Sequence, residues 1–199
     1  MTIVPHALSE GRISEEAYLE GELNSDIRHE YIDGLIYAMS GARVNHSRIS
    51  GNLYRKFGNH LDNSPCEPFT SDMKVRIASR FFYPDVLVDC SDNDGEATFT
   101  ETPVIIVEVL SRSTRKLDKT IKMNSYLQIP TLQEYILIEQ AFVELEVVRK
   151  RDNHWQRPEH YYLGDKVAFE SIGLMLSVEE IYERVDNDDM KEWREKPVR

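Results

Sequence analysis

The stretch Pro103-Val104-Ile105-Ile106-Val107-Glu108-Val109-Leu110 decides the fold of this chain. Every residue in it except Glu108 is apolar, and a short run of this kind is typical of a central strand covered on both faces. A buried carboxylate without a partner is costly, so Glu108 must meet a cation, a metal ion or a proton. Two interpretations are open: a structural salt bridge with a nearby Arg or Lys, or a metal ligand where the strand meets solvent.

The segments around this strand predict an α/β or α+β fold, with helices flanking a mixed sheet. An Asp33-Gly34 pair between two largely apolar runs predicts an N-terminal hairpin. Ile49, Leu53 and Phe57 recur at helical spacing and predict a helix over about 44–61. Further helices are expected from Ser14, over about 114–128 and from Ser177, and further strands over 73–77, 83–90, 135–139, 143–149 and 160–163. We expect an N-terminal arm over 1–13, a single domain over 14–185 and a polar, frayed tail over 186–199.

The charge of the chain argues against one class of protein. The 199 residues include 24 Lys and Arg against 35 Asp and Glu, which gives a net charge of −11. A protein that holds nucleic acid mainly through a basic surface usually has the opposite balance. An enzyme that acts on nucleic acid is not excluded, because a metal site needs carboxylates.

The two cysteines, Cys66 and Cys90, form no Cys-x-x-Cys pair and no cluster with metal-ligand spacing. We therefore expect two reduced thiols, buried as small apolar side chains, in a cytoplasmic protein. The N-terminus lacks a basic segment followed by an apolar one, and no apolar run approaches the roughly 18 residues of a membrane span. No membrane association is expected.

A second acid precedes a neighbouring apolar strand. Asp85 follows Pro84 and opens the run Val86-Leu87-Val88. Two adjacent strands that each offer one acid could bring both carboxylates to a hard divalent cation such as Mg²⁺, which also keeps waters and substrate phosphate as ligands. Asp85 and Glu108 are therefore the candidate pair.

The segment that follows Glu108 is basic. Between Ser111 and Lys122 there are five Lys and Arg residues against Asp118, a local charge of 5 − 1 = +4. Lys122 lies near the buried side of the expected helix, and it could reach a site at the end of the Glu108 strand. The alternative is an ordinary ion pair between Asp118 and Lys122 at i, i+4, which contributes only a few tenths of a kcal/mol.

These motifs resemble one family across roughly residues 14–165. The matching blocks are Arg28-His29-Glu30-Tyr31-Ile32-Asp33-Gly34, Met39-Ser40-Gly41-Ala42 with His46, Tyr83-Pro84-Asp85-Val86-Leu87-Val88, and Glu108-Val109-Leu110-Ser111-Arg112-Ser113-Thr114 with Asp118, Lys122 and Tyr126. The sequence resembles the Uma2 family, also called DUF820, of the PD-(D/E)XK nuclease superfamily.

The resemblance implies a restriction-endonuclease-like fold, with Asp85 and Glu108 as metal-binding acids and the main-chain carbonyl of Val109 as a further ligand. The metal would be Mg²⁺, with Mn²⁺ as a substitute. The superfamily places a lysine two residues after the second acid, where this chain has Leu110. Lys122 is the first candidate for a lysine that has moved to the following helix, and Lys119 is the second.

Two N-terminal residues have competing interpretations. Glu30 is a possible additional acid of the site, as in some relatives, and its alternative is an exposed strand residue. His46 is expected at the start of a helix, where a capping or structural role is favoured over that of a general base.

The first functional hypothesis is a Mg²⁺-dependent endonuclease that hydrolyses DNA phosphodiester bonds. A homodimer is expected, because cutting both strands needs two sites. The second hypothesis is a catalytically silent nuclease fold that acts as a binding or regulatory module, and the third is a metal-dependent enzyme on another phosphate ester. The position of Lys122 relative to Asp85 and Glu108 discriminates between the first two.

Overall fold

A seven-stranded mixed sheet forms the centre of the computed structural model, which describes residues 11–39 and 41–196. The strand order is β11-β10-β9-β8-β6-β3, and β12 pairs with β10. The bounds are β3 Glu67–Thr70, β6 Val86–Asp89, β8 Pro103–Leu110, β9 Glu134–Glu139, β10 Leu145–Arg151, β11 His154–Trp155 and β12 Glu159–Tyr161. β8 pairs parallel with β9 and antiparallel with β6. The predictions of a mixed sheet and of a central strand around Glu108 are confirmed.

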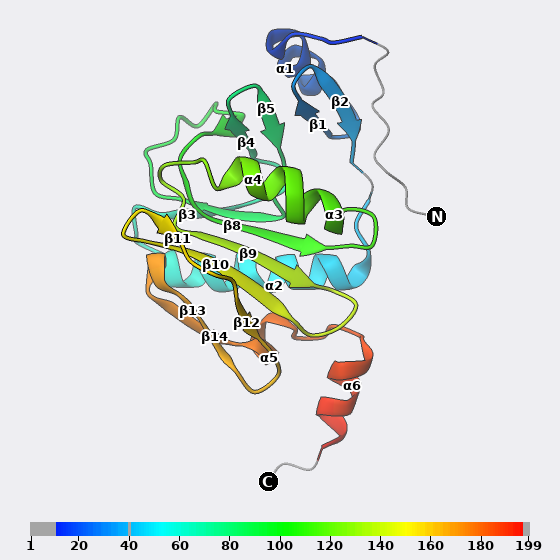
Figure 1. Ribbon diagram of the computed structural model, residues 1–199, viewed down its shortest axis with the longest axis vertical. Helices are drawn as coiled ribbons and strands as arrows, with labels where there is room; N and C mark the ends of the chain where they lie inside the picture. Colours follow the sequence, from blue (N-terminus) through cyan, green and yellow to red (C-terminus); the bar gives the residue numbers. More distant parts are fainter. Residues whose placement is uncertain (1–10, 40, 197–199) are drawn as a thin grey trace.

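Helices cover both faces of this sheet (Figure 1). α2 (Val44–Leu61) packs Ile49, Leu53, Phe57 and Leu61 against one face, as its apolar periodicity predicted. The other face is covered by a helical segment made of α3 (Arg115–Leu117), a π turn η1 (Asp118–Lys122) and α4 (Met123–Tyr126). Side chains alternate along a strand, so Glu108 shares its face with Ile106 and Leu110, beneath that segment.

A smaller five-stranded sheet carries the N-terminal hairpin, in the order β2-β1-β5-β4-β7. Its strands are β1 His29–Ile32, β2 Leu35–Ala38, β4 Lys74–Ile77, β5 Arg80–Phe82 and β7 Phe99–Thr100, and α1 (Glu15–Leu23) packs beside it. The Asp33-Gly34 turn joins β1 to β2 as predicted, and both turn residues have positive φ, which glycine tolerates without strain. Most of the arm expected over residues 1–13 lies outside the described residues.

The C-terminal part of the chain packs on the side of the central sheet that α2 covers. It consists of β13 (Lys166–Phe169), η2 (Glu170–Ile172), β14 (Leu174–Ser177), α5 (Val178–Ile181) and α6 (Asp188–Glu195). The expected fraying from Asp186 needs correction for α6, because Asn187 caps this helix and Met190 is buried in the core. Within the described residues, no helix is both long and apolar enough to cross a membrane.

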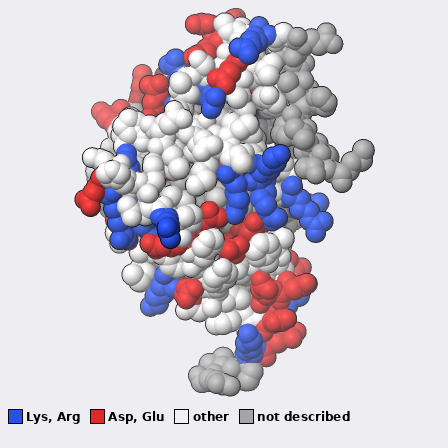
Figure 2. Space-filling model, in the orientation of Figure 1, with Lys and Arg blue, Asp and Glu red and all other residues white. Residues whose placement is uncertain are grey.

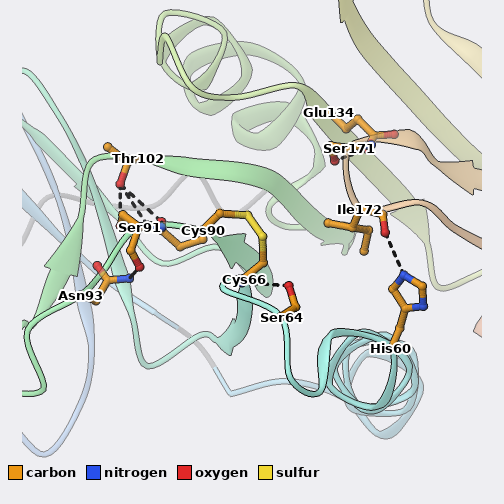
Figure 3. Close-up of a disulfide and its surroundings, with 11 residues drawn as sticks. His60, Ser64, Cys66, Cys90, Ser91, Asn93, Thr102, Glu134, Ser171 and Ile172 are labelled. Carbon is orange, nitrogen blue, oxygen red and sulfur yellow. Dashed lines mark hydrogen bonds between the residues drawn. A yellow bond between two sulfur atoms is a disulfide. The ribbon is translucent and has the colours of Figure 1, made fainter.

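The prediction of two reduced, buried thiols is wrong. Cys66 and Cys90 form a disulfide, and both residues are half-buried rather than buried (Figure 3). The bond lies where β3 pairs antiparallel with β6, one position beyond the pairing of Glu67 with Asp89. The register of two strands therefore brings the thiols together, although the sequence spacing of 24 gives no motif.

Candidate active site

The ammonium group of Lys122 lies at the centre of a buried cluster of carboxylates. Its Nζ is 2.7 Å from Oε1 of Glu108 and 2.9 Å from Oε1 of Glu30. The contact to Oδ1 of Asp118 is longer, at 3.6 Å. All four residues are buried, with 4% of Lys122 and 3% of Glu108 exposed. The Asp118–Lys122 pair anticipated as an alternative is therefore present, but the shorter contacts of Lys122 are to the two glutamates.

The π turn η1 explains how Lys122 reaches this position. The main-chain N–H of Met123 donates to the carbonyl of Asp118, five residues back, which widens the turn. Both Asp118 and Lys122 lie on the buried side of the widened turn. The hydroxyl of Tyr135 on β9 donates to the same carbonyl at 3.0 Å and ties the turn to the sheet.

Removing the hydrogen bond from Tyr135 to the carbonyl of Asp118 should lower the stability of the protein modestly. We expect Tyr135→Phe to lower the free energy of unfolding by about 1 kcal/mol, because one buried hydrogen bond is lost while Met123 still satisfies the carbonyl. Urea denaturation measures the change. Tyr54→Phe on the exposed part of α2 is the matched control, and an equal effect in the two variants would contradict a specific role for Tyr135.

Burial and charge oppose one another within the cluster. Burial raises the pKa of Glu108 well above its usual range, although the charge of Lys122 acts to lower it. Burial acts to lower the pKa of Lys122, but the charges of Glu108 and Glu30 outweigh it and raise that pKa, so the ammonium stays charged. Burial also raises the pKa of Asp118 to about 6. The hydroxyl of Tyr126 donates to Oε1 of Glu108 at 3.0 Å and further stabilises its carboxylate.

Asp85 lies beside the strand that carries Glu108. Its Oδ2 accepts a hydrogen bond of 2.6 Å from the main-chain N–H of Val109, which fixes the carboxylate next to β8. Nε2 of His46 is 3.2 Å from the same oxygen. Burial acts to lower the pKa of His46, but the hydrogen bond and charge of Asp85 raise it overall. The sequence favoured a capping or structural role for His46 and missed this contact, which joins the start of α2 to the candidate site.

Two carboxylates of this region offer oxygen atoms of the kind that a hard divalent cation prefers. Oδ1 of Asp85 and Oε2 of Glu108 receive no hydrogen bond from any described residue. The described part of the chain contains no group of three or more His, Cys, Asp or Glu side chains suited to hold a metal ion. Mg²⁺ needs no such cage, since it commonly uses one or two carboxylates with waters and substrate phosphates.

The two secondary candidates, Glu30 and Lys119, differ in their placement. Glu30 is buried, contacts Lys122 and accepts a weak hydrogen bond of 3.4 Å from the N–H of Tyr83, so it is not the exposed strand residue of the alternative. Lys119 points away from the cluster, and its Nζ pairs with Glu146 of β10 at 2.6 Å. The structure therefore brings Glu30, Glu108 and Lys122 together, with Asp85 beside β8, and leaves Lys119 outside.

A mixed sheet flanked by helices, with Asp85 directly before β6 and Glu108 within the adjacent β8, is typical of a restriction-endonuclease-like fold. Residues 15–179 match the model of the Uma2 family, whose description reads "Putative restriction endonuclease". The chain belongs to the Uma2 family.

Three known proteins are similar to this chain. "Uncharacterized protein slr1290" of Synechocystis sp. is 40% identical over 174 residues, which cover 86% of this chain and 92% of that protein. "Uncharacterized protein sll1609" of the same organism is 37% identical over 144 residues, or 69% and 81% of the two chains. A crystal structure of "a putative nuclease belonging to DUF820" from Anabaena variabilis has a TM-score of 0.67 and 19% identity, and it covers 79% of this chain and 91% of that one. At this identity the likeness concerns the fold alone.

Proposed function

We propose that the protein is a Mg²⁺-dependent endonuclease that hydrolyses DNA phosphodiester bonds. The observation that carries this proposal is the position of Lys122, whose ammonium lies 2.7 Å from Glu108 although Leu110 stands at the usual lysine position. Lys122 thus offers a replacement for that lysine from the following helix. A lysine far from Glu108 would have favoured a silent member of the family.

Each residue has a defined task in the proposed reaction. Asp85, Glu108 and the carbonyl of Val109 would hold the cation. A bound Mg²⁺ would polarise the scissile phosphate and lower the pKa of a coordinated water. Lys122 would orient the attacking water or stabilise the charge that develops on the phosphate. Glu30 would keep Lys122 protonated and in place, because its carboxylate lies 2.9 Å from the ammonium.

Assembly and location extend the same proposal. Cleavage of both strands of a duplex needs two sites, so we propose a homodimer, which light scattering of the purified protein tests. A cytoplasmic location is also proposed. The Cys66–Cys90 disulfide bears on this location. Cytosolic disulfides in mesophiles are usually transient, catalytic or redox-sensing, so a cytoplasmic location implies a bond of that kind.

A second candidate is a nuclease fold that binds nucleic acid without cutting it. The burial of the centre supports this alternative, because only 3% of Glu108 and 4% of Lys122 are exposed. A phosphate could reach these groups only if covering side chains moved. Cleavage assays separate the two candidates.

The test is cleavage of plasmid DNA and of duplex oligonucleotides with Mg²⁺ or Mn²⁺. The proposal predicts nicked and linear products that EDTA abolishes and that disappear in Asp85→Ala and Glu108→Ala. Glu96→Ala is the matched control, because Glu96 is an exposed acid in the loop between β6 and β7. Equal activity in wild type and both site variants would reveal a contaminating nuclease and reject the assignment.

A further inference from the structure

Two segments that are distant in sequence meet around Asp85. Oδ2 of Asp85 contacts Nε2 of His46 at the start of α2 and the N–H of Val109 near the end of β8. Arg43 precedes His46 by three residues, and Arg112 follows Val109 by three. Three residues span at most about 11 Å of chain, so the backbone of each arginine lies within that distance of a residue that contacts Asp85.

Both segments are free of acidic residues. No Asp or Glu occurs over 41–61 or over 109–117, although the whole chain carries a net charge of −11. We call four basic residues of these segments the cationic rim: Arg43, Arg48, Arg112 and Lys116. In Figure 2, blue side chains gather right of centre, at the height of α3 and the start of α2 in Figure 1, while red side chains predominate over α6.

The charges of the cationic rim are available for a partner. Arg43, Arg112 and Lys116 are exposed and Arg48 is half-buried. None of the four makes an ion pair with a carboxylate anywhere in residues 11–39 and 41–196. Arg115 and Lys119, in contrast, are engaged by Glu139 and Glu146 and are left out of the rim.

The loop that carries Arg112 is held by its own hydroxyl groups. Oγ of Ser111 lies 3.0 Å from Oγ of Ser113 and 3.0 Å from Oγ1 of Thr114, and it accepts from the N–H of Thr114 at 3.2 Å. This turn presents Arg112 and Ser113 to solvent directly after β8. Arginine and hydroxyl side chains are common phosphate-contacting groups in nucleic-acid complexes.

We infer that the cationic rim binds the phosphates that flank the scissile bond of a DNA duplex. This inference rests on the proposed function, since it names the surface that holds the substrate of that same site. A polyanion suits this arrangement because its flanking phosphates can meet the cations of the rim, while one phosphate reaches the carboxylates and Lys122 once the covering side chains move. A single free phosphate would gain little from cations spread over two segments.

Binding of a fluorescent duplex in EDTA, measured by anisotropy over a range of salt, tests the rim without cleavage. We expect Arg43→Ala/Arg112→Ala to weaken binding to all sequences alike and to reduce the slope of log K against log salt by about 0.9 per lost contact. Arg157→Ala/Lys166→Ala is the matched control, because both residues are exposed cations without an ion pair to a described carboxylate. Arg43 makes no side-chain cap bond to α2, so its removal spares the helix.

The outcomes separate the rim from the proposed function. A reduced slope in the rim variant alone supports the inference, even if the wild type never cuts DNA. An unchanged slope overturns the inference, while cleavage that depends on Asp85 would still stand. Equal losses in the rim and control variants would also overturn it, since binding would then follow net charge rather than this surface.

Discussion

Lys122→Met should lower the rate of DNA cleavage by roughly 10²–10³-fold, the usual effect of removing one preorganised charge-stabilising donor. Methionine has a similar length but no charge, so it could neither orient the attacking water nor stabilise the charge that develops on the phosphate. Glu108 and Glu30 would face one another without the ammonium that now lies 2.7 and 2.9 Å from them. Single-turnover cleavage of a labelled duplex measures the effect.

Two further variants make this prediction decisive. Lys119→Met, three residues earlier, is the matched control. It should keep wild-type activity, because Lys119 pairs with Glu146 of β10 outside the carboxylate cluster. Lys122→Arg keeps the buried charge and protects the fold, yet its guanidinium cannot occupy the place of a compact ammonium, so we expect at least a tenfold loss. Wild-type rates in a folded Lys122→Met protein would remove Lys122 from the mechanism.

Loss of the disulfide should lower the free energy of unfolding by several kcal/mol. Cys66 and Cys90 are 24 residues apart, and closing a loop of this length stabilises the folded state by about 3.5 kcal/mol through the entropy of the unfolded chain. Cys66→Ser/Cys90→Ser should therefore unfold at a clearly lower urea concentration. The closed loop contains Asp85, so the same bond supports the segment that carries the candidate metal ligand.

A reducing agent provides the control for this effect. Dithiothreitol should bring the wild-type urea midpoint close to that of the double serine variant, and it should leave the variant unchanged. A wild-type midpoint that does not respond to complete reduction, verified by thiol titration, would show that the bond adds no stability.

Three elements of the fold could be predicted from local sequence patterns alone. The apolar spacing of α2, the Asp33-Gly34 turn and the apolar run of β8 each carry their own signal, and the structure confirms all three. The helix after Glu108 was expected as one regular element over about 114–128. The structure divides this helix at η1. The division could not be predicted, because one additional residue in a turn leaves no mark in composition or apolar spacing.

The long-range contacts of the site were harder to predict. His46 meets Asp85 only because α2 lies across the face of the sheet, and nothing near His46 in the sequence indicates that partner. The Cys66–Cys90 bond depends in the same way on the register of β3 with β6. Glu108 was recognisable because a single acid in an apolar strand requires a partner, whatever surrounds it.

The π turn also bears on how related chains should be compared. A π turn is equivalent to the insertion of one residue into an α-helix, so the helices before and after it keep their phase. Deleting Thr120 would close the bulge into a regular helix without turning Tyr126 away from the sheet. Asp118 and the lysine would then be three residues apart instead of four, a spacing that still places both on one face of a regular helix. A gap of one residue in this segment of an alignment would thus identify a relative that has lost the π turn, while a lysine four residues before the buried tyrosine would still face the sheet.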